Sequence, residues 1–117
     1  GPGPVRIESS DEGGVTVVRL AGVIRLGESA QEFSAYLEEL LDRGRGPVLL
    51  DLSRIDHVDS TGLGELVGYL QRFADAGRGL ALLRPHERIM ALLRLTKLDE
   101  IFPVHDDLDR ALAELGE

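Results

Sequence analysis

Short apolar runs alternate along this chain with stretches of helical periodicity. The first two runs, Val5–Ser9 and Val15–Ala21, flank a turn rich in acidic residues and glycine, and they predict an antiparallel hairpin. Val48–Leu50 and Leu80–Leu83 are apolar at every position, which is typical of strands buried on both faces. A last, brief strand is predicted near Ile101–Val104.

Four stretches carry apolar residues at helical spacing. The first begins at Ser29, which has the spacing of a capping box with Glu32, and it ends near Arg43. The other three run from about Thr61 to Ala76, from Arg88 to Leu95, and from a cap at Asp106 or Asp107 through Leu115. Strands and helices that alternate in this way predict an α/β fold, with a mostly parallel sheet of four to five strands and helices packed on it.

A chain of 117 residues supports one domain, which we assign to residues 5–117. Gly1–Pro4 are interpreted as the remnant of a cleavage site or as a disordered N-terminus. The net charge of −8 argues against nucleic acid as a partner, and it favours a basic protein partner or simple solubility. With no cysteine, no signal peptide and no apolar run of about 20 residues, we expect no disulfide, no membrane insertion and a cytoplasmic location.

The stretch Val48–Gly64 carries the candidate chemistry. Asp51 is predicted to end the buried strand, and residues 53–59 then form a polar connection that Ile55 and Val58 anchor to the core. The sequence Asp59-Ser60-Thr61-Gly62-Leu63-Gly64 opens the second helix. Two hydroxyls and an acid therefore lie where a strand passes into a helix, a position that often carries function in open α/β sheets.

Ser60 has two interpretations. A serine at or beside a helix N-cap accepts a backbone N–H bond worth about 1 kcal/mol, and this structural role is the commoner one for the residue type. As a phosphorylation site, Ser60 would hold its phosphate near the free N–H groups of the helix, so the modified domain need not unfold. The added charge, beside Asp59 and near Asp56 and Glu65, would repel an acidic or apolar partner surface.

Three glycines, Gly62, Gly64 and Gly68, fall in the first turns of this helix. Each costs about 0.5–1 kcal/mol relative to alanine, so their presence needs a reason. Either the helix packs very close to the sheet, or one face is kept smooth for a second protein. Residues two apart on a helix point in nearly opposite directions, so we expect Gly62 or Gly64 to face outward.

Other chemistries fit the sequence poorly. Asp51, Asp56, Asp59 and His57 resemble the acidic site of a phospho-acceptor or metal-binding domain, but the acidic pair and the late-strand lysine of such a site are missing. There is no Gly-x-Ser-x-Gly elbow and no complete dinucleotide fingerprint, and His57, His86 and His105 fall in predicted loops without recognisable partners. We therefore expect no metal, no cofactor, no catalytic residue and no enzymatic activity.

The segment DLSRIDHVDSTGLGEL resembles the central motif of STAS domains, and more narrowly of bacterial anti-sigma factor antagonists. In these proteins a strand, an Asp-Ser-Thr/Ser-Gly-Leu-Gly corner and a long helix follow one another. The stretch from Leu92 to Phe102 is similar to a later segment of the family, so the resemblance extends over nearly the whole chain after Pro4.

The resemblance implies a non-enzymatic switch. An anti-sigma factor with serine kinase activity would phosphorylate Ser60, with Thr61 as a weaker candidate, and a PP2C-type phosphatase would remove the phosphate. Asp59 would contribute to partner recognition. The docking face would include three neighbouring residues, Gly62, Leu63 and Gly64.

One position departs from the family pattern. Arg25 stands where the family often has an acid, which implies an altered partner surface at this edge or a partner that offers an acid to Arg25. The alternative function is a constitutive regulatory STAS subunit of a transporter or of a stressosome-like assembly. We expect a monomer or a weak dimer, with Leu26, Phe33 or the edge of the hairpin as candidate contacts.

Overall fold

A computed structural model describes residues 5–44 and 46–116; Gly1–Pro4, and the prediction made for them, lie outside the described residues. Its five strands are β1 (Val5–Glu12), β2 (Val15–Ile24), β3 (Val48–Val58), β4 (Leu80–Leu83) and β5 (Val104–His105). They form one sheet in the order β1-β2-β3-β4-β5. The β1–β2 hairpin is antiparallel and every later pairing is parallel, which confirms the predicted α/β architecture.

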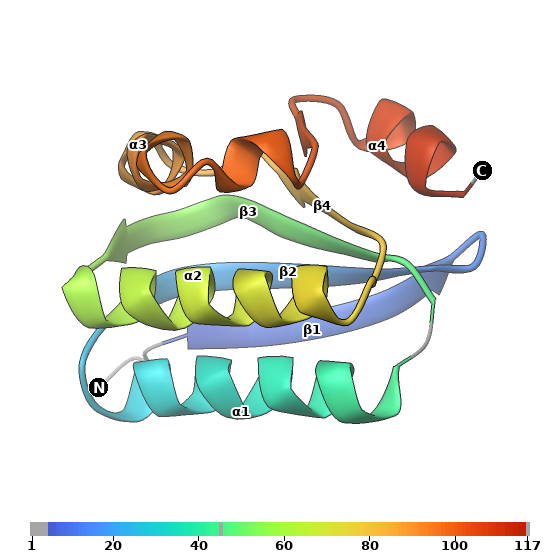
Figure 1. Cartoon of the computed structure of the whole chain (residues 1–117). Coiled ribbons are helices and arrows are strands. Elements are labelled where there is room, and N and C mark those ends of the chain that lie inside the picture. Colours follow the sequence, from blue (N-terminus) through green and yellow to red (C-terminus); the bar gives the residue numbers. More distant parts are fainter. Residues whose placement is uncertain (1–4, 45, 117) are drawn as a thin grey trace.

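The described helices are α1 (Glu28–Arg43), α2 (Ser60–Asp75), α3 (Glu87–Leu95) and α4 (Leu108–Leu115), with a single 3₁₀ turn at Leu98–Glu100. In Figure 1, α1 and α2 run side by side along one face of the sheet, and α4 lies on the other side of it. None of the described helices is long and apolar enough to cross a bilayer.

The main core lies between the sheet and α1, α2 and α3. Because side chains alternate along a strand, Leu50 and Leu52 of β3 enter this core, whereas Leu49 points to a smaller cluster beneath α4. Val48, Leu49 and Leu50 are only 1%, 0% and 0% exposed, so the prediction of a strand buried on both faces is confirmed. The helices contribute larger side chains to the main core, among them Phe33, Leu37, Leu66, Leu70 and Phe73.

The predicted end of the third strand at Asp51 is wrong. β3 continues to Val58 and pairs with β2 along its whole length. Its pairing with β2 slips by one residue at two places, so the buried positions after Leu52 recur every third residue, at Ile55 and Val58. Such bulges hide the alternation that marks a strand, and the polar residues between the anchors therefore resembled a loop.

The predicted capping box of α1 is also wrong. The helix begins one residue earlier, after Gly27, whose φ of 110° is in the left-handed region that favours glycine. Ser29 is buried at 1% exposure, and its hydroxyl accepts the Arg25 N–H at 2.8 Å and donates to the Arg25 carbonyl at 3.0 Å. Ser29 therefore fixes the loop before the helix rather than capping the helix.

The histidines also differ from their predicted setting. His57 lies on the exposed side of β3, and the ring of His86 caps α3 by accepting the Arg88 N–H at 3.1 Å. His105 belongs to β5, which follows the 3₁₀ turn and starts later than predicted, and its Nε2 lies 2.7 Å from the Glu114 carboxylate. The predicted loop location is therefore wrong for His57 and His105, which lie in strands, and right for His86, which precedes α3.

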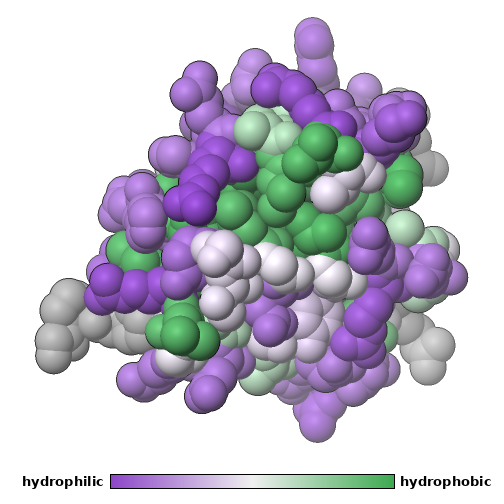
Figure 2. Space-filling model, turned by 60° about the vertical axis from the view of Figure 1, so that its left-hand side comes forward, coloured by the Kyte–Doolittle hydropathy of each residue, from purple (hydrophilic) through white to green (hydrophobic). Residues whose placement is uncertain are grey.

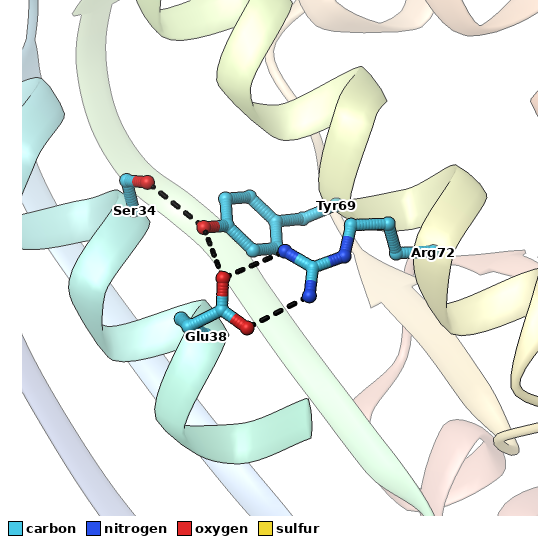
Figure 3. A network of polar contacts seen from close by, with 4 residues as sticks. All are labelled: Ser34, Glu38, Tyr69 and Arg72. Atoms are coloured by element: carbon cyan, nitrogen blue, oxygen red, sulfur yellow. Dashed lines mark hydrogen bonds and ion pairs between the residues drawn. The ribbon is translucent and has the colours of Figure 1, made fainter. Parts of the chain in front are cut away.

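A polar network joins α1 to α2 on the side away from the sheet (Figure 3). Both oxygens of Glu38 accept hydrogen bonds from the Arg72 guanidinium at 2.7 Å, and Tyr69 donates its hydroxyl hydrogen to Glu38 at 3.1 Å. The Tyr69 oxygen also lies 3.0 Å from the Ser34 hydroxyl. The Arg72 guanidinium lowers the pKa of the Glu38 carboxyl, so the pair stays ionised and holds the two helices in register.

Candidate functional site

Asp59 organises the corner between β3 and α2. Its Oδ1 accepts the Gly62 N–H at 2.9 Å, so Asp59 is the N-cap of α2, and its Oδ2 accepts the Leu26 N–H at 2.8 Å. The Asp59 N–H in turn donates to the Ile24 carbonyl at 3.1 Å. One residue therefore connects the end of β2, the loop that follows it and the start of α2.

These backbone bonds keep the Asp59 side chain charged. The hydrogen bond from Gly62, followed by that from Leu26, lowers the pKa of the Asp59 carboxyl below its ordinary value of 3.8. Donors that favour the charged form of an acid always shift its pKa in this direction. At neutral pH the corner thus carries a fixed negative charge next to Ser60.

Ser60 is the first residue of α2, and its side chain is exposed. Its hydroxyl makes no hydrogen bond within residues 5–44 and 46–116, and the side chain that caps the helix is that of Asp59, which accepts the Gly62 N–H. The capping role, which is the commoner one for a serine at this position, belongs to Asp59. A phosphate on Ser60 would share the start of α2 with the Asp59 carboxylate, which already accepts the Gly62 N–H.

The two hydroxyls of the corner face different grooves. Ser60 borders a shallow groove of about 430 Å³ between α2 and α3, whose other walls include Leu63, Val67 and Leu92. Thr61 borders a second groove, of about 460 Å³, between α1 and α2, together with Leu26. The start of α2 is thus a ridge with an apolar groove on each side.

The three glycines of α2 have different surroundings. A Cβ on Gly62 would lie 2.8 Å from atoms of both Ile24 and Val58, so this glycine allows α2 to pack closely on the sheet. A Cβ on Gly64 or Gly68 would meet nothing within 4 Å, and both residues line the α2–α3 groove. The expectation that Gly62 or Gly64 faces outward is confirmed, and the outward residue is Gly64.

Apolar side chains gather around this end of the molecule. Figure 2 shows a broad hydrophobic area on the side that carries the start of α2. The described surface includes three large exposed apolar residues, Leu26 at 77%, Leu95 at 79% and Ile101 at 56% exposure. Leu26 lies in the loop tied to Asp59, and Leu95 ends α3, the helix that contributes Leu92 to the groove beside Ser60.

The structure brings Arg25 to the same corner. Ser29 holds its backbone, and its neighbour Leu26 is bonded to Asp59, so Arg25 lies close to the N-terminus of α2. That side chain is exposed and forms no ion pair among the described residues.

Sequence reasoning found the corner but not the two grooves. The grooves depend on how far α1 and α3 lie from α2, which no local pattern reports. In the sequence, the grooves could have been suspected only from Leu26 and Leu95, which prove to be exposed, since large apolar residues gathered on a surface often mark a contact site. Among the described residues, no group of three metal-ligating side chains comes together.

Comparison with known proteins places these features in a wider group. The family model of the STAS domain matches residues 6–111. A Thermotoga neapolitana protein named as a candidate anti-sigma factor antagonist is 35% identical over 89 residues, which cover 75% of this chain and 79% of that protein. The anti-sigma F factor antagonist of Paenibacillus polymyxa is 28% identical over 111 residues, 95% of each chain.

The fold is found in a related crystal structure. A candidate anti-sigma factor antagonist from Thermotoga maritima superposes with a TM-score of 0.79 at 27% identity, over 95% of each chain. The similarity thus extends through both faces of the sheet and is not confined to the corner.

Proposed function

We propose that this chain is a protein-interaction switch controlled by phosphorylation. The chain belongs to the STAS domain family and, like its curated relatives, to the anti-sigma factor antagonists within that family. In the unphosphorylated state the chain binds an anti-sigma factor that is also a serine kinase. Phosphorylation of Ser60 releases this partner, and a PP2C-type phosphatase restores binding. The chain works in the cytoplasm, where sigma factors act, and contributes no catalysis of its own.

The observation that carries the proposal is that the Ser60 side chain is exposed and does not cap α2. The first residue of α2 is exposed, its hydroxyl makes no hydrogen bond among the described residues, and Asp59 caps the helix in its place. A kinase can therefore reach the hydroxyl without opening the fold. Thr61 is half-buried and faces the other groove, which supports Ser60 as the acceptor.

The charge of the corner explains how a phosphate would release the partner. A phosphoserine carries about −1.5 to −2 charges at neutral pH. Here it would stand next to the ionised Asp59 and beside an apolar groove. A partner that had filled this groove with apolar side chains would then have to bury or face the phosphate, which is costly.

The docking face follows from the same geometry. It consists of the ridge at the start of α2, with Ser60, Leu63 and Gly64, and of the groove floored by Gly64 and Gly68. Asp59 supports the ridge, and Arg25 offers a positive charge at its edge. Gly62 packs against the sheet, so it shapes the ridge from below rather than meeting the partner.

Phosphosite mapping tests this proposal. The full chain and its Ser60→Ala and Thr61→Ala variants are incubated with ATP and each anti-sigma factor kinase of the source organism, and intact and fragment masses are then measured. We expect one phosphate on the wild type and on Thr61→Ala, located at Ser60, and none on Ser60→Ala. Kinases that modify their own antagonists but leave this chain unmodified would reject the switch and favour a constitutive docking subunit.

A further inference from the structure

The second face of the sheet carries a polar recess that the switch does not use. α4 covers the start of this face, where Ala111 packs on Val17, Leu49 and Leu83. Beyond the helix, the strands border an open recess of about 350 Å³. Its walls are mainly charged, and they include Arg6, Arg54, Arg84, Glu8 and Asp51.

Two arginines flank an alanine in the centre of the recess. Arg6 of β1 pairs with Ala21 of β2, and Ala21 pairs with Arg54 of β3, so the three residues form one row across the sheet. Adjacent strands are about 4.8 Å apart, which separates the outer two Cα atoms by roughly 10 Å. Both guanidinium groups can therefore reach one small ligand held above the short Ala21 side chain.

A bulge of β3 creates this row. The pairing between β2 and β3 slips by one residue between Arg19 and Ala21, which brings Arg54 rather than Ser53 opposite Ala21. Without this slip, Arg54 would leave the row. Bulges that redirect a side chain are over-represented next to binding sites.

Arg6 and Arg54 have no partner within the described ranges. Both side chains are exposed, and neither forms an ion pair with residues 5–44 or 46–116. Arg19, in contrast, is held by Glu12 and by the Ser10 hydroxyl, and Arg84 donates its Nε–H to the Asp106 carbonyl at 2.7 Å. Two guanidinium groups without an ion pair among the described residues thus line one recess, in a chain whose net charge is −8.

The acids of the recess supply a second kind of contact. In the neighbouring row of the sheet, Glu8 of β1 and Asp51 of β3 lie opposite Arg19 of β2 in the strand register. The Arg19 guanidinium, however, bonds to Glu12 and Ser10. One oxygen of Asp51 accepts from the Ser53 hydroxyl at 2.6 Å, which leaves its other oxygen available. These carboxylates can accept hydrogen bonds from hydroxyl groups, whereas they would repel a second phosphate.

We propose that this recess binds a small phosphate monoester that carries hydroxyl groups, of the sugar-phosphate class. Arg6 and Arg54 hold the phosphate from both sides through bidentate hydrogen bonds, the geometry that guanidinium groups favour with phosphate. Glu8 and Asp51 accept hydrogen bonds from the hydroxyl groups of the ligand. A volume of about 350 Å³ is sufficient for one such molecule.

Amide NMR titration of the full, unphosphorylated chain tests the proposal. Glucose 6-phosphate, inorganic phosphate and glucose are added separately at constant ionic strength. We expect saturable shifts at residues 6, 21 and 54 with glucose 6-phosphate, weaker binding of inorganic phosphate, and none of glucose. Equal affinity for inorganic phosphate would overturn the assigned ligand class, and shifts spread over all basic residues would overturn the site.

Substitutions locate the contacts. Arg6→Gln and Arg54→Gln should each weaken glucose 6-phosphate binding about tenfold or more, as expected for a lost charged hydrogen bond. Arg110→Gln makes the same change of charge on α4, away from the recess, and should leave the affinity unchanged. Equal losses in all three variants would refute the clamp. Because the measurement needs neither kinase nor partner, its failure is independent of the switch at Ser60.

Discussion

Replacing the glycines of α2 by alanine should change the free energy of unfolding in opposite directions at different positions of the same helix. Gly62, Gly64 and Gly68 are each replaced by alanine, which adds a single methyl group and improves helix propensity at every site. The structure places a wall of Ile24 and Val58 atoms 2.8 Å from the new Cβ at position 62. At positions 64 and 68 it places nothing within 4 Å.

These surroundings set the expected magnitudes. Gly64→Ala and Gly68→Ala should each stabilise the fold by about 0.5–1 kcal/mol, since alanine loses less backbone entropy than glycine in a helix. Gly62→Ala should destabilise it by about 1–3 kcal/mol, the range observed when a methyl group is forced into a packed contact. For a chain of this length, the two outward variants should melt about 2–5 °C higher than the wild type.

Urea denaturation and thermal melting measure these differences directly. Binding of the anti-sigma factor supplies a second readout, because a methyl group at position 64 or 68 would project into the groove beside Ser60. We expect the two more stable variants to bind the partner more weakly. A destabilised Gly64→Ala, or a Gly62→Ala as stable as the wild type, would refute the assignment of the inward and outward faces of α2.

Three further predictions concern the corner and the core. Asp59→Asn should destabilise the fold at neutral pH, because folding lowers the pKa of the Asp59 carboxyl. The contribution of the ionised carboxylate to the free energy of unfolding is complete above the ordinary pKa of 3.8, and it is lost as the pH falls through the lowered value. Urea denaturation from about pH 7 downward should show the gap between variant and wild type closing, and a gap that stays constant would contradict this cause. Arg25→Ala should weaken anti-sigma factor binding in calorimetry while leaving the melting temperature unchanged, because the side chain is exposed and unpaired among the described residues; a lowered melting temperature would show a structural role instead. Leu70→Ala should cost about 2–5 kcal/mol in urea denaturation, since Leu70 is 1% exposed in the main core, and a loss below about 1 kcal/mol would contradict its placement.

The sequence was sufficient to predict the order of strands and helices. The continuous apolar run Val48–Leu50 and the helical spacing of apolar residues in α2 are patterns within one segment of the chain, and the strand and the helix that they predict were both confirmed. The second half of β3 was missed because two bulges replace the alternation of buried residues with a spacing of three. A bulge is a property of the pairing with β2, so β3 alone does not reveal it.

At the site, too, features local to one segment were predicted, whereas features that depend on contacts between segments were not. Asp59 and Ser60 are neighbours in the chain, but which of them caps α2 depends on the loop after β2, whose Leu26 N–H donates to the second Asp59 oxygen. The role of Ser29 was misassigned for a different, local reason: its hydroxyl bonds to the backbone of Arg25, four residues earlier, rather than to the helix. Hydrogen bonds between residues distant in sequence, and the grooves between helices, exist only once the fold is formed.

The measurement that tests the switch most directly compares two forms of this chain. The anti-sigma factor that phosphorylates the chain in mass mapping is titrated, in calorimetry, with unmodified chain and with chain carrying phosphate on Ser60 alone. We predict saturable binding of the unmodified chain and at least a hundredfold loss of affinity for the phosphorylated one, about 2.7 kcal/mol. Equal affinity of the two forms would contradict the switch, even if Ser60 is phosphorylated.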